Sequence, residues 1–299
     1  MRFAMKVCLK CGEGFVSSDW LCPACGFSPP QRFGYHVFAP EIAERSEGFN
    51  AYLFEQFAAI ESSHFWFKGR NELIADMLAS YFPVAQNLLE IGCGTGVVLA
   101  GIRQRFPDMS LTGTEALVSG LGYAAKRVAD ATVFQMDARA IPFDAEFEVI
   151  GAFDVLEHIE EDERVLRQMY RACRQGGGII LTVPQHPFLW SATDEYACHK
   201  RRYTRQELVG KVESAGFVVQ RVSSFVSLLL PLMVLSRLLQ RKPATESNPI
   251  DAGFRIGNQL NRVLGFVLEL ERFAIKRGLR FRWAARCCWW EESSDWRRL

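Results

Sequence analysis

The stretch from Leu88 to Gly96 constrains the fold most, because an apolar run containing one acid leads directly into three alternating glycines. The residues are Leu88-Leu89-Glu90-Ile91-Gly92-Cys93-Gly94-Thr95-Gly96, and an apolar helix pattern follows from Gly96 to Arg105. This order predicts a buried parallel strand, a tight turn and a helix N-terminus. Glycines let the backbone approach a ligand, and the free amides of the first helical turn face it. The third glycine comes one residue too early for a dinucleotide fingerprint.

Strands and helices alternate after this turn. Further strands are predicted at 110–114, 132–136, 147–153, 178–183 and 217–225, with helices at about 161–174 and 204–215. Such alternation predicts a doubly wound, mostly parallel sheet with helices on both faces. A seventh strand is expected near Phe281 to Trp290, antiparallel to the sixth. Ligands of such folds bind beyond the carboxyl ends of the strands.

Glu115 stands at one of these strand ends, about twenty residues after the glycines. An acid in this place can accept both hydroxyls of a ribose. A solvated surface acid is the competing interpretation, and the position at the strand end favours the nucleoside.

The pattern E-x-G-x-G-x-G resembles the first motif of the class I S-adenosylmethionine-dependent methyltransferases, in which the acid holds the amino-acid end of the cofactor. The resemblance implies a seven-stranded Rossmann-like core, and Asp137 would bond the adenine amino group. The implied S-adenosylmethionine-binding residues are Glu90, Gly92, Cys93, Gly94, Thr95, Gly96, Glu115, Ala116, Asp137, Ala138, Asp154 and Val155.

The run Asp154-Val155-Leu156-Glu157-His158-Ile159 resembles the D-x-L-E-H-I signature of methyltransferases that act on quinones and similar small molecules. In some of these relatives the corresponding acid, Glu and His form a magnesium site, so Mg²⁺ at Asp154, Glu157 and His158 is one expectation. The other is that Asp154 lines the cofactor pocket while Glu157 orients His158, which acts as a general base or only packs.

The segment after the fifth strand suits an acceptor site, because histidines, aromatics and cations gather there. His186 and His199 are further candidate bases, and the catalytic set is taken as His158, His199 and Glu157. The order Trp-Ser, Asp-Glu, His-x-Arg-Arg-Tyr is similar to a subfamily active on small molecules and on glycan or lipid precursors. The cations at 200–202 could bind phosphate or carboxylate, although such runs are usually solvated.

Two C-x-x-C pairs, Cys8/Cys11 and Cys22/Cys25, open the chain. Four thiolates in a short segment with little core suit structural Zn²⁺, which supplies folding energy that the segment lacks. We expect a zinc ribbon at 1–30 with no open metal coordination position. A redox dithiol is the alternative, but the two pairs and the missing βαβ context count against it.

Residues 31–82 are expected to form a helical cap or linker in front of the core at 83–225. The segment from Ile42 to Arg70 is rich in aromatic residues and is predicted to be helical, and a further helix is predicted from Asn71 to Tyr81. The run from His64 to Phe67, followed by Arg70-Asn71, resembles a segment that covers the cofactor in many small-molecule methyltransferases. A helix that only caps the sheet is the alternative.

Residues 226–299 exceed a minimal methyltransferase. The apolar run from Val222 to Ser236 is too short to span a bilayer as a straight helix. A polar linker at 243–249, an apolar helix pattern at 256–268 and a basic tail follow. This order suits peripheral membrane contact through 226–290, and a helical lid on its own sheet or on a second subunit is the alternative.

Composition narrows the class of function. The 299 residues carry a net charge of +1 and 49% hydrophobic residues, so charge gives no argument for nucleic acid. Nine cysteines without a predicted signal peptide indicate a reducing compartment, so we expect the cytoplasm, with peripheral contact at the inner face of the membrane.

The preferred function is methyl transfer, most readily to oxygen, on a lipid-linked, quinone-like or glycan precursor. The alternatives are an RNA methyltransferase that binds substrate through the zinc ribbon, and a non-catalytic cofactor-binding scaffold. Nucleic acid is disfavoured because no basic-aromatic stripe is present.

Overall fold

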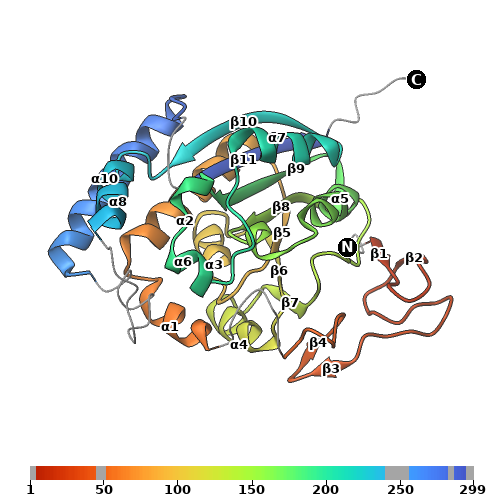
Figure 1. Cartoon of the computed structure of the whole chain (residues 1–299). Helices are drawn as coiled ribbons and strands as arrows, with labels where there is room; N and C mark the ends of the chain where they lie inside the picture. Colours follow the sequence, from red (N-terminus) through yellow and green to blue (C-terminus); the bar gives the residue numbers. More distant parts are fainter. Residues whose placement is uncertain (1–4, 45–51, 240–255, 282–285, 294–299) are drawn as a thin grey trace.

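A seven-stranded sheet forms the centre of the molecule in a computed structural model that describes residues 5–44, 52–239, 256–281 and 286–293 (Figure 1). Its order is β10-β11-β9-β8-β5-β6-β7. The strands are β5 (Asn87–Ile91), β6 (Ser110–Glu115), β7 (Thr132–Gln135), β8 (Phe147–Phe153), β9 (Cys173–Pro184), β10 (Phe217–Phe225) and β11 (Arg286–Ser293).

The direction of the strands confirms the predicted doubly wound sheet. Strands β5 to β9 pair in parallel, and β11 runs antiparallel to both β9 and β10. The predicted start of the last strand at Phe281 is wrong: Phe281 precedes the strand, and its carbonyl accepts a hydrogen bond of 3.1 Å from the amide of Ser224. Strand β11 lies inside the sheet, between β10 and β9, although it follows all the other strands in sequence.

Helices cover both faces of the sheet and bury two apolar cores. One core joins the sheet to α5 (Asp162–Ala172) and α7 (Arg205–Ser214). The other joins it to α2 (Phe65–Tyr81), α3 (Val97–Arg105), α4 (Val118–Arg127) and α10 (Asn258–Lys276). The shorter elements are α1 (Leu53–Ile60), η1 (Leu156–His158), η2 (Pro187–Leu189), α6 (Ala192–Tyr196) and α8 (Leu230–Leu239).

Two predicted boundaries are wrong. A boundary was predicted between a helical segment at 42–70 and a separate helix that begins at Asn71. In the structure Asn71 lies inside α2, so there is no boundary at this residue. The chain instead breaks after α1, where extended His64 caps α2 by accepting a 3.3 Å hydrogen bond from the amide of Trp66. The helix predicted to run to residue 174 ends at Ala172, because Cys173 already pairs with Phe147 as the first residue of β9.

The two additions to the core lie on opposite sides of it (Figure 1). At the N-terminal end β1 (Met5–Val7) pairs with β2 (Gly14–Val16), and β3 (Gln31–Arg32) pairs with β4 (Tyr35–His36). On the other side α8 and α10 lie together beside α2, and buried Leu268 of α10 sits against Gly69. Helix α10 therefore packs on its own domain, chiefly against α2. No helix of the described residues is long and apolar enough to cross a bilayer.

Candidate functional site

The glycine turn between β5 and α3 has the backbone that its sequence predicts. Gly92, Gly94 and Gly96 all have positive φ, at 68°, 53° and 76°. A Cβ on Gly92 would lie 2.5 Å from Cγ2 of Val155, and one on Gly96 would lie 2.8 Å from Cα of Ala124. Only glycine meets both demands, so the turn brings bare backbone to the strand ends.

A cavity of about 960 Å³ opens at the carboxyl ends of β5, β6, β7 and β8. Most of the residues predicted to bind cofactor line it. These are Gly92, Gly94, Glu115, Ala116, Asp137, Ala138, Asp154 and Val155, and the predicted base His158 joins them.

The other four predicted cofactor residues lie behind this lining. Glu90 is buried beneath the turn, and burial raises its carboxyl pKa well above the usual range. Cys93 packs behind the turn on Gly113, and Gly96 on Ala124. The Thr95 hydroxyl is held by Glu61 and Arg127, away from the cavity.

Glu115 reaches back from β6 to the glycine turn. Its carboxylate accepts hydrogen bonds from the amides of Gly94 at 3.0 Å, Ala116 at 2.8 Å and Leu117 at 3.3 Å. Burial raises the pKa of Glu115, and these amides oppose the rise by stabilising the anion. The carboxylate thus links two strand ends at one wall of the cavity.

Asp137 has a partner that its motif does not predict. Both of its carboxylate oxygens accept hydrogen bonds from Arg139, which also donates to Glu161 at 2.9 and 3.0 Å. A ligand that bonds Asp137 would share this acid with the guanidinium. Arg139 follows Asp137 by two residues, and only the proximity in sequence could have indicated it.

Asp154 pairs with a residue of α2. It has a positive φ of 61°, and its Oδ2 accepts a 2.5 Å hydrogen bond from Arg70 of α2. The Arg70 guanidinium stacks 4.6 Å from the Trp66 ring and lowers the pKa of nearby Glu90, against the larger effect of burial. No role for Arg70 could be predicted from the sequence; in the structure its guanidinium pairs with Asp154, and its charge acts on Glu90.

Glu157, His158 and His199 come together from η1 and a distant loop. Their ligand atoms lie within 4.8 Å of one another, and the rings of His158 and His199 meet edge to face with centroids 4.8 Å apart. Nδ1 of His199 lies 2.9 Å from Asp194, which two bonds from Arg202 also hold. Burial opposes ionisation of Asp194, but these partners hold its pKa well below the usual range.

The structure does not support the predicted magnesium ligands as a set, because Asp154 pairs with Arg70 and lies outside this cluster of described residues. Two imidazoles and one carboxylate also fit Mg²⁺ poorly, since this ion prefers oxygen ligands. The cluster is better suited to moving a proton, with Asp194 fixing the orientation of His199.

The cations at 200–202 do not form one anion site. Arg201 pairs with Glu160 and Asp162, and Arg202 pairs with Asp194. Lys200 lines the cavity. His186, the third candidate base, is not among the residues that line the cavity in the described part of the chain. Glu41, Ile42 and Phe54 do line it, although no strand-end motif marks them.

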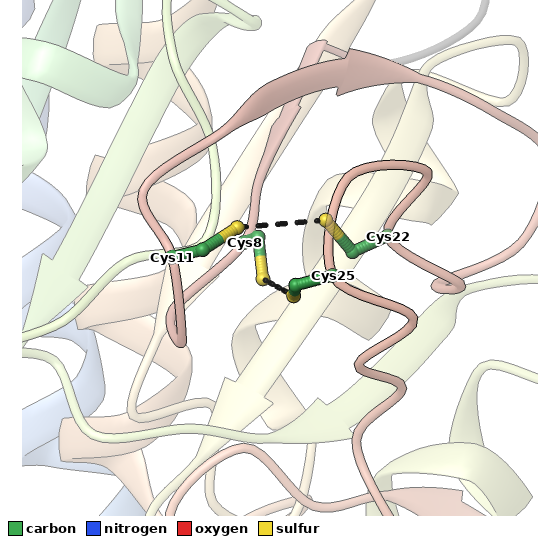
Figure 2. Close-up of side chains that lie close together, drawn as sticks. All are labelled: Cys8, Cys11, Cys22 and Cys25. Atoms are coloured by element: carbon green, nitrogen blue, oxygen red, sulfur yellow. Dashed lines mark hydrogen bonds between the residues drawn. The ribbon is translucent and has the colours of Figure 1, made fainter.

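The four N-terminal cysteines converge on one point (Figure 2). The Sγ atoms of Cys8 and Cys25 are 3.7 Å apart, as are those of Cys11 and Cys22. Tetrahedral zinc with Zn–S bonds of about 2.3 Å requires Sγ separations of about 3.8 Å, whereas a disulfide would need about 2 Å. The cysteines therefore fit a structural zinc ion.

A model of the methyltransferase domain family matches residues 63–222. Ajmaline N-methyltransferase of Rauvolfia serpentina is 28% identical over 156 residues, 50% of this chain and 52% of its own length. The 27-O-demethylrifamycin SV methyltransferase of Amycolatopsis mediterranei is 32% identical over 124 residues, 36% of this chain and 43% of its own. The chain spans about half the length of the curated relatives it matches.

A solved structure shares the fold. Phosphoethanolamine N-methyltransferase 2 of Haemonchus contortus, in complex with S-adenosyl-L-methionine, superposes with a TM-score of 0.51 at 18% identity. The superposition covers 75% of this chain and 53% of that one.

Proposed function

This chain belongs to the methyltransferase domain family, and on that premise we propose that it transfers a methyl group from S-adenosylmethionine to a small-molecule acceptor. The observation that carries the proposal is one cavity that is lined by residues from four strand ends, among them Gly92, Glu115, Asp137 and Asp154. Across the sheet these strand ends follow the order Asp154, Gly92, Glu115 and Asp137, so one elongated adenosyl-amino-acid ligand could contact them in turn.

Each strand end has a proposed part of the cofactor. The glycine turn lets the amino-acid moiety approach the backbone, and Glu115 accepts the ribose hydroxyls. Asp137 and Ala138 meet the adenine. Arg70 pairs with Asp154, which lines the cavity, so Arg70 is proposed to hold the carboxylate of the cofactor while Asp154 faces its ammonium.

The proposed reaction is an in-line displacement. The acceptor heteroatom attacks the methyl carbon while the carbon–sulfur bond breaks, which leaves S-adenosylhomocysteine. The proton lost by the acceptor passes to His158, the histidine that lines the cavity. His199 and Asp194 position this base, and alignment with exclusion of water provides most of the acceleration.

The acceptor is proposed to be lipid-linked, quinone-like or a glycan precursor that is methylated on oxygen. Exposed apolar side chains on α8 and α10 support peripheral membrane contact. They are Leu232, Leu235, Leu260, Val263, Phe266, Leu270 and Phe273. Flotation with anionic vesicles tests this contact, and a protein that stays at the bottom of the gradient would contradict it.

Cofactor binding is the direct test of the main proposal. Calorimetric titration should show binding of S-adenosylhomocysteine, and Gly92→Ala should weaken it at least about tenfold, because the new Cβ overlaps Val155. Gly122→Ala on α4 is the matched control, since its Cβ would meet nothing within 4 Å. A wild-type protein that does not bind the ligand would overturn the proposal.

The acceptor class is tested with methyl-labelled S-adenosylmethionine, offered separately with lipid extract, polar small molecules and total RNA. We expect label in a small-molecule or lipid fraction. Label in RNA would instead favour an RNA methyltransferase.

A further inference from the structure

The zinc ribbon is packed directly against the cofactor domain. The term ribbon is used here for residues 5–30, which carry the cysteine cluster. The side chain of Trp20 packs among aromatic rings of the domain. Its ring centroid lies 4.6 Å from that of Phe38, 5.8 Å from that of Phe134 and 5.4 Å from that of Phe143. Phe134 belongs to β7, so the contact reaches the edge of the main sheet.

Backbone hydrogen bonds fix the ribbon on the same side. The amide of Val7 donates to Pro142 at 3.0 Å, and the amide of Asp144 donates to Met5 at 3.1 Å. Strand β1 thereby lies antiparallel to the segment that leads from the Asp137 loop into β8. This segment follows residues that line the cavity.

The chain that leaves the ribbon continues along β7. Val37 forms a parallel bridge with Gln135, and the amide of Phe38 donates to the Gln135 carbonyl at 3.1 Å. The Gln135 side chain, 0% exposed, bonds both the amide and the carbonyl of Ala39 at 2.9 Å. It also donates to the carbonyl of Ala116, a cavity residue, at 2.9 Å.

This attachment ends in the cavity wall. The carbonyl of Ala43 accepts a 2.8 Å hydrogen bond from the amide of Val118, which fixes the far end of the segment. Between these two anchors, Glu41 and Ile42 line the cavity together with residues that follow β6 and β7. Those are the strand ends to which the proposed function gives the ribose and the adenine.

The ribbon has only a small hydrophobic core of its own. Among the described residues its hydrophobic cluster consists of buried Cys8, Phe15 and Cys22 with partly buried Phe27, and two of these four are cysteines of the metal-ligand set. Because this core is small, a bound metal would have to supply much of the free energy that orders the two C-x-x-C turns.

We propose that metal binding at Cys8, Cys11, Cys22 and Cys25 is thermodynamically coupled to cofactor binding, through Trp20 and the 37–43 segment that forms one wall of the cavity. The inference rests on the proposed function. The metal holds the ribbon in shape, the ribbon holds Trp20 and the segment, and the segment closes the adenosine end. Coupling is reciprocal, so the cofactor must raise zinc affinity by the factor by which zinc raises cofactor affinity.

The first experiment measures the affinity for S-adenosylhomocysteine in zinc-loaded protein, with zinc content checked for each sample. Trp20→Ala keeps all four cysteines and should weaken binding at least about fivefold, the lower end of ordinary coupling factors. Leu21→Ala is the matched control, because the Leu21 side chain is 55% exposed and adjacent in sequence. Equal affinities in wild type and Trp20→Ala would overturn the proposal.

The second experiment needs no variant. Zinc affinity of the wild-type protein is measured by competition with a chromogenic chelator, with and without saturating S-adenosylhomocysteine. Tighter zinc binding in its presence supports the coupling, and unchanged zinc affinity overturns it even if Trp20→Ala does not fold. Wild-type protein that does not bind S-adenosylhomocysteine at all would overturn the proposed function itself.

Discussion

Asp76 carries a buried charge with three cationic partners away from the cavity. Its carboxylate, 0% exposed, pairs with Arg105 at 2.6 Å, Arg272 at 2.5 Å and Lys276 at 3.2 Å. Burial alone would raise the pKa of Asp76, but hydrogen bonds and charge from these cations lower it. An acid of the core thus holds α10 to α2 and α3.

Asp76→Asn should destabilise the protein by about 2 kcal/mol at neutral pH, because a charged hydrogen-bond acceptor is lost. The folded-state pKa is depressed, so this stability is present above the unfolded value of about 4 and is lost as pH falls through the folded value. Thermal midpoints of wild type and variant should therefore converge below about pH 4. A constant gap, equal to that at pH 7, would contradict this. Exposed Asp108→Asn serves as control.

His158 is proposed to accept a proton without holding the cofactor. His158→Ala should lower the methyl-transfer rate at saturating substrate about a hundredfold, the lower end of general-base contributions. The affinity for S-adenosylhomocysteine should change by less than about twofold. His186→Ala, outside the cavity lining, is the control, and an unchanged rate in His158→Ala would remove that residue from the mechanism.

The residues of the site were predictable to different degrees. Glu115, Asp137 and Asp154 could be located from sequence, because parallel strands bring their carboxyl ends to one edge. Arg70, Arg139 and Glu41 come from a helix, a loop and the strip after the ribbon, so no strand periodicity marks them. His199 could be named as a candidate, but its contact with His158 depends on tertiary folding.

At the scale of elements, α10 shows what an apolar pattern leaves open. One side of this helix carries buried Leu268 and Ile275, and the other side carries exposed Phe266, Leu270 and Phe273. Periodicity identified a helix but could not tell which side meets the protein. Gly69 of α2 favours the observed orientation of α10, because the absence of a side chain at this position lets Leu268 approach α2 closely.

Leu268→Ala should therefore lower the free energy of unfolding by about 2–5 kcal/mol, because it leaves a cavity between α10, α2 and β10. Leu270→Ala, two residues away and 50% exposed, should change it by less than about 0.5 kcal/mol. Denaturant midpoints of the two variants measure the difference. Equal losses would show that α10 is not part of the core.

At the scale of the whole molecule, the sheet depends on its most distant strand. β11 pairs with both β9 and β10, from Arg286 opposite Pro184 to Ser293 opposite Phe217. Sequence could predict a late antiparallel strand from the resemblance to the methyltransferase fold. The predicted bounds of this strand differ from the observed ones because charged residues and tryptophans in this part of the sequence obscure the alternating strand pattern.

Removal of residues 282–299 should abolish cooperative unfolding, because β9 and β10 lose the strand between them. Circular dichroism during heating should show a broad, low-temperature transition in place of a sharp one. Removal of 294–299 alone leaves every residue of β11 in place and should preserve the transition. A sharp, unshifted transition in the longer truncation would contradict the role of β11.

The position of β11 also affects the order in which the sheet can form during synthesis. On the ribosome, β5 to β10 emerge well before Arg286, yet the gap between β9 and β10 can close only when 286–293 have left the exit tunnel. The nascent chain must wait with two open strand edges in its middle, where chaperones could bind. We therefore expect the complete sheet to form only after β11 has been synthesised, later than the pairing of β5 to β9.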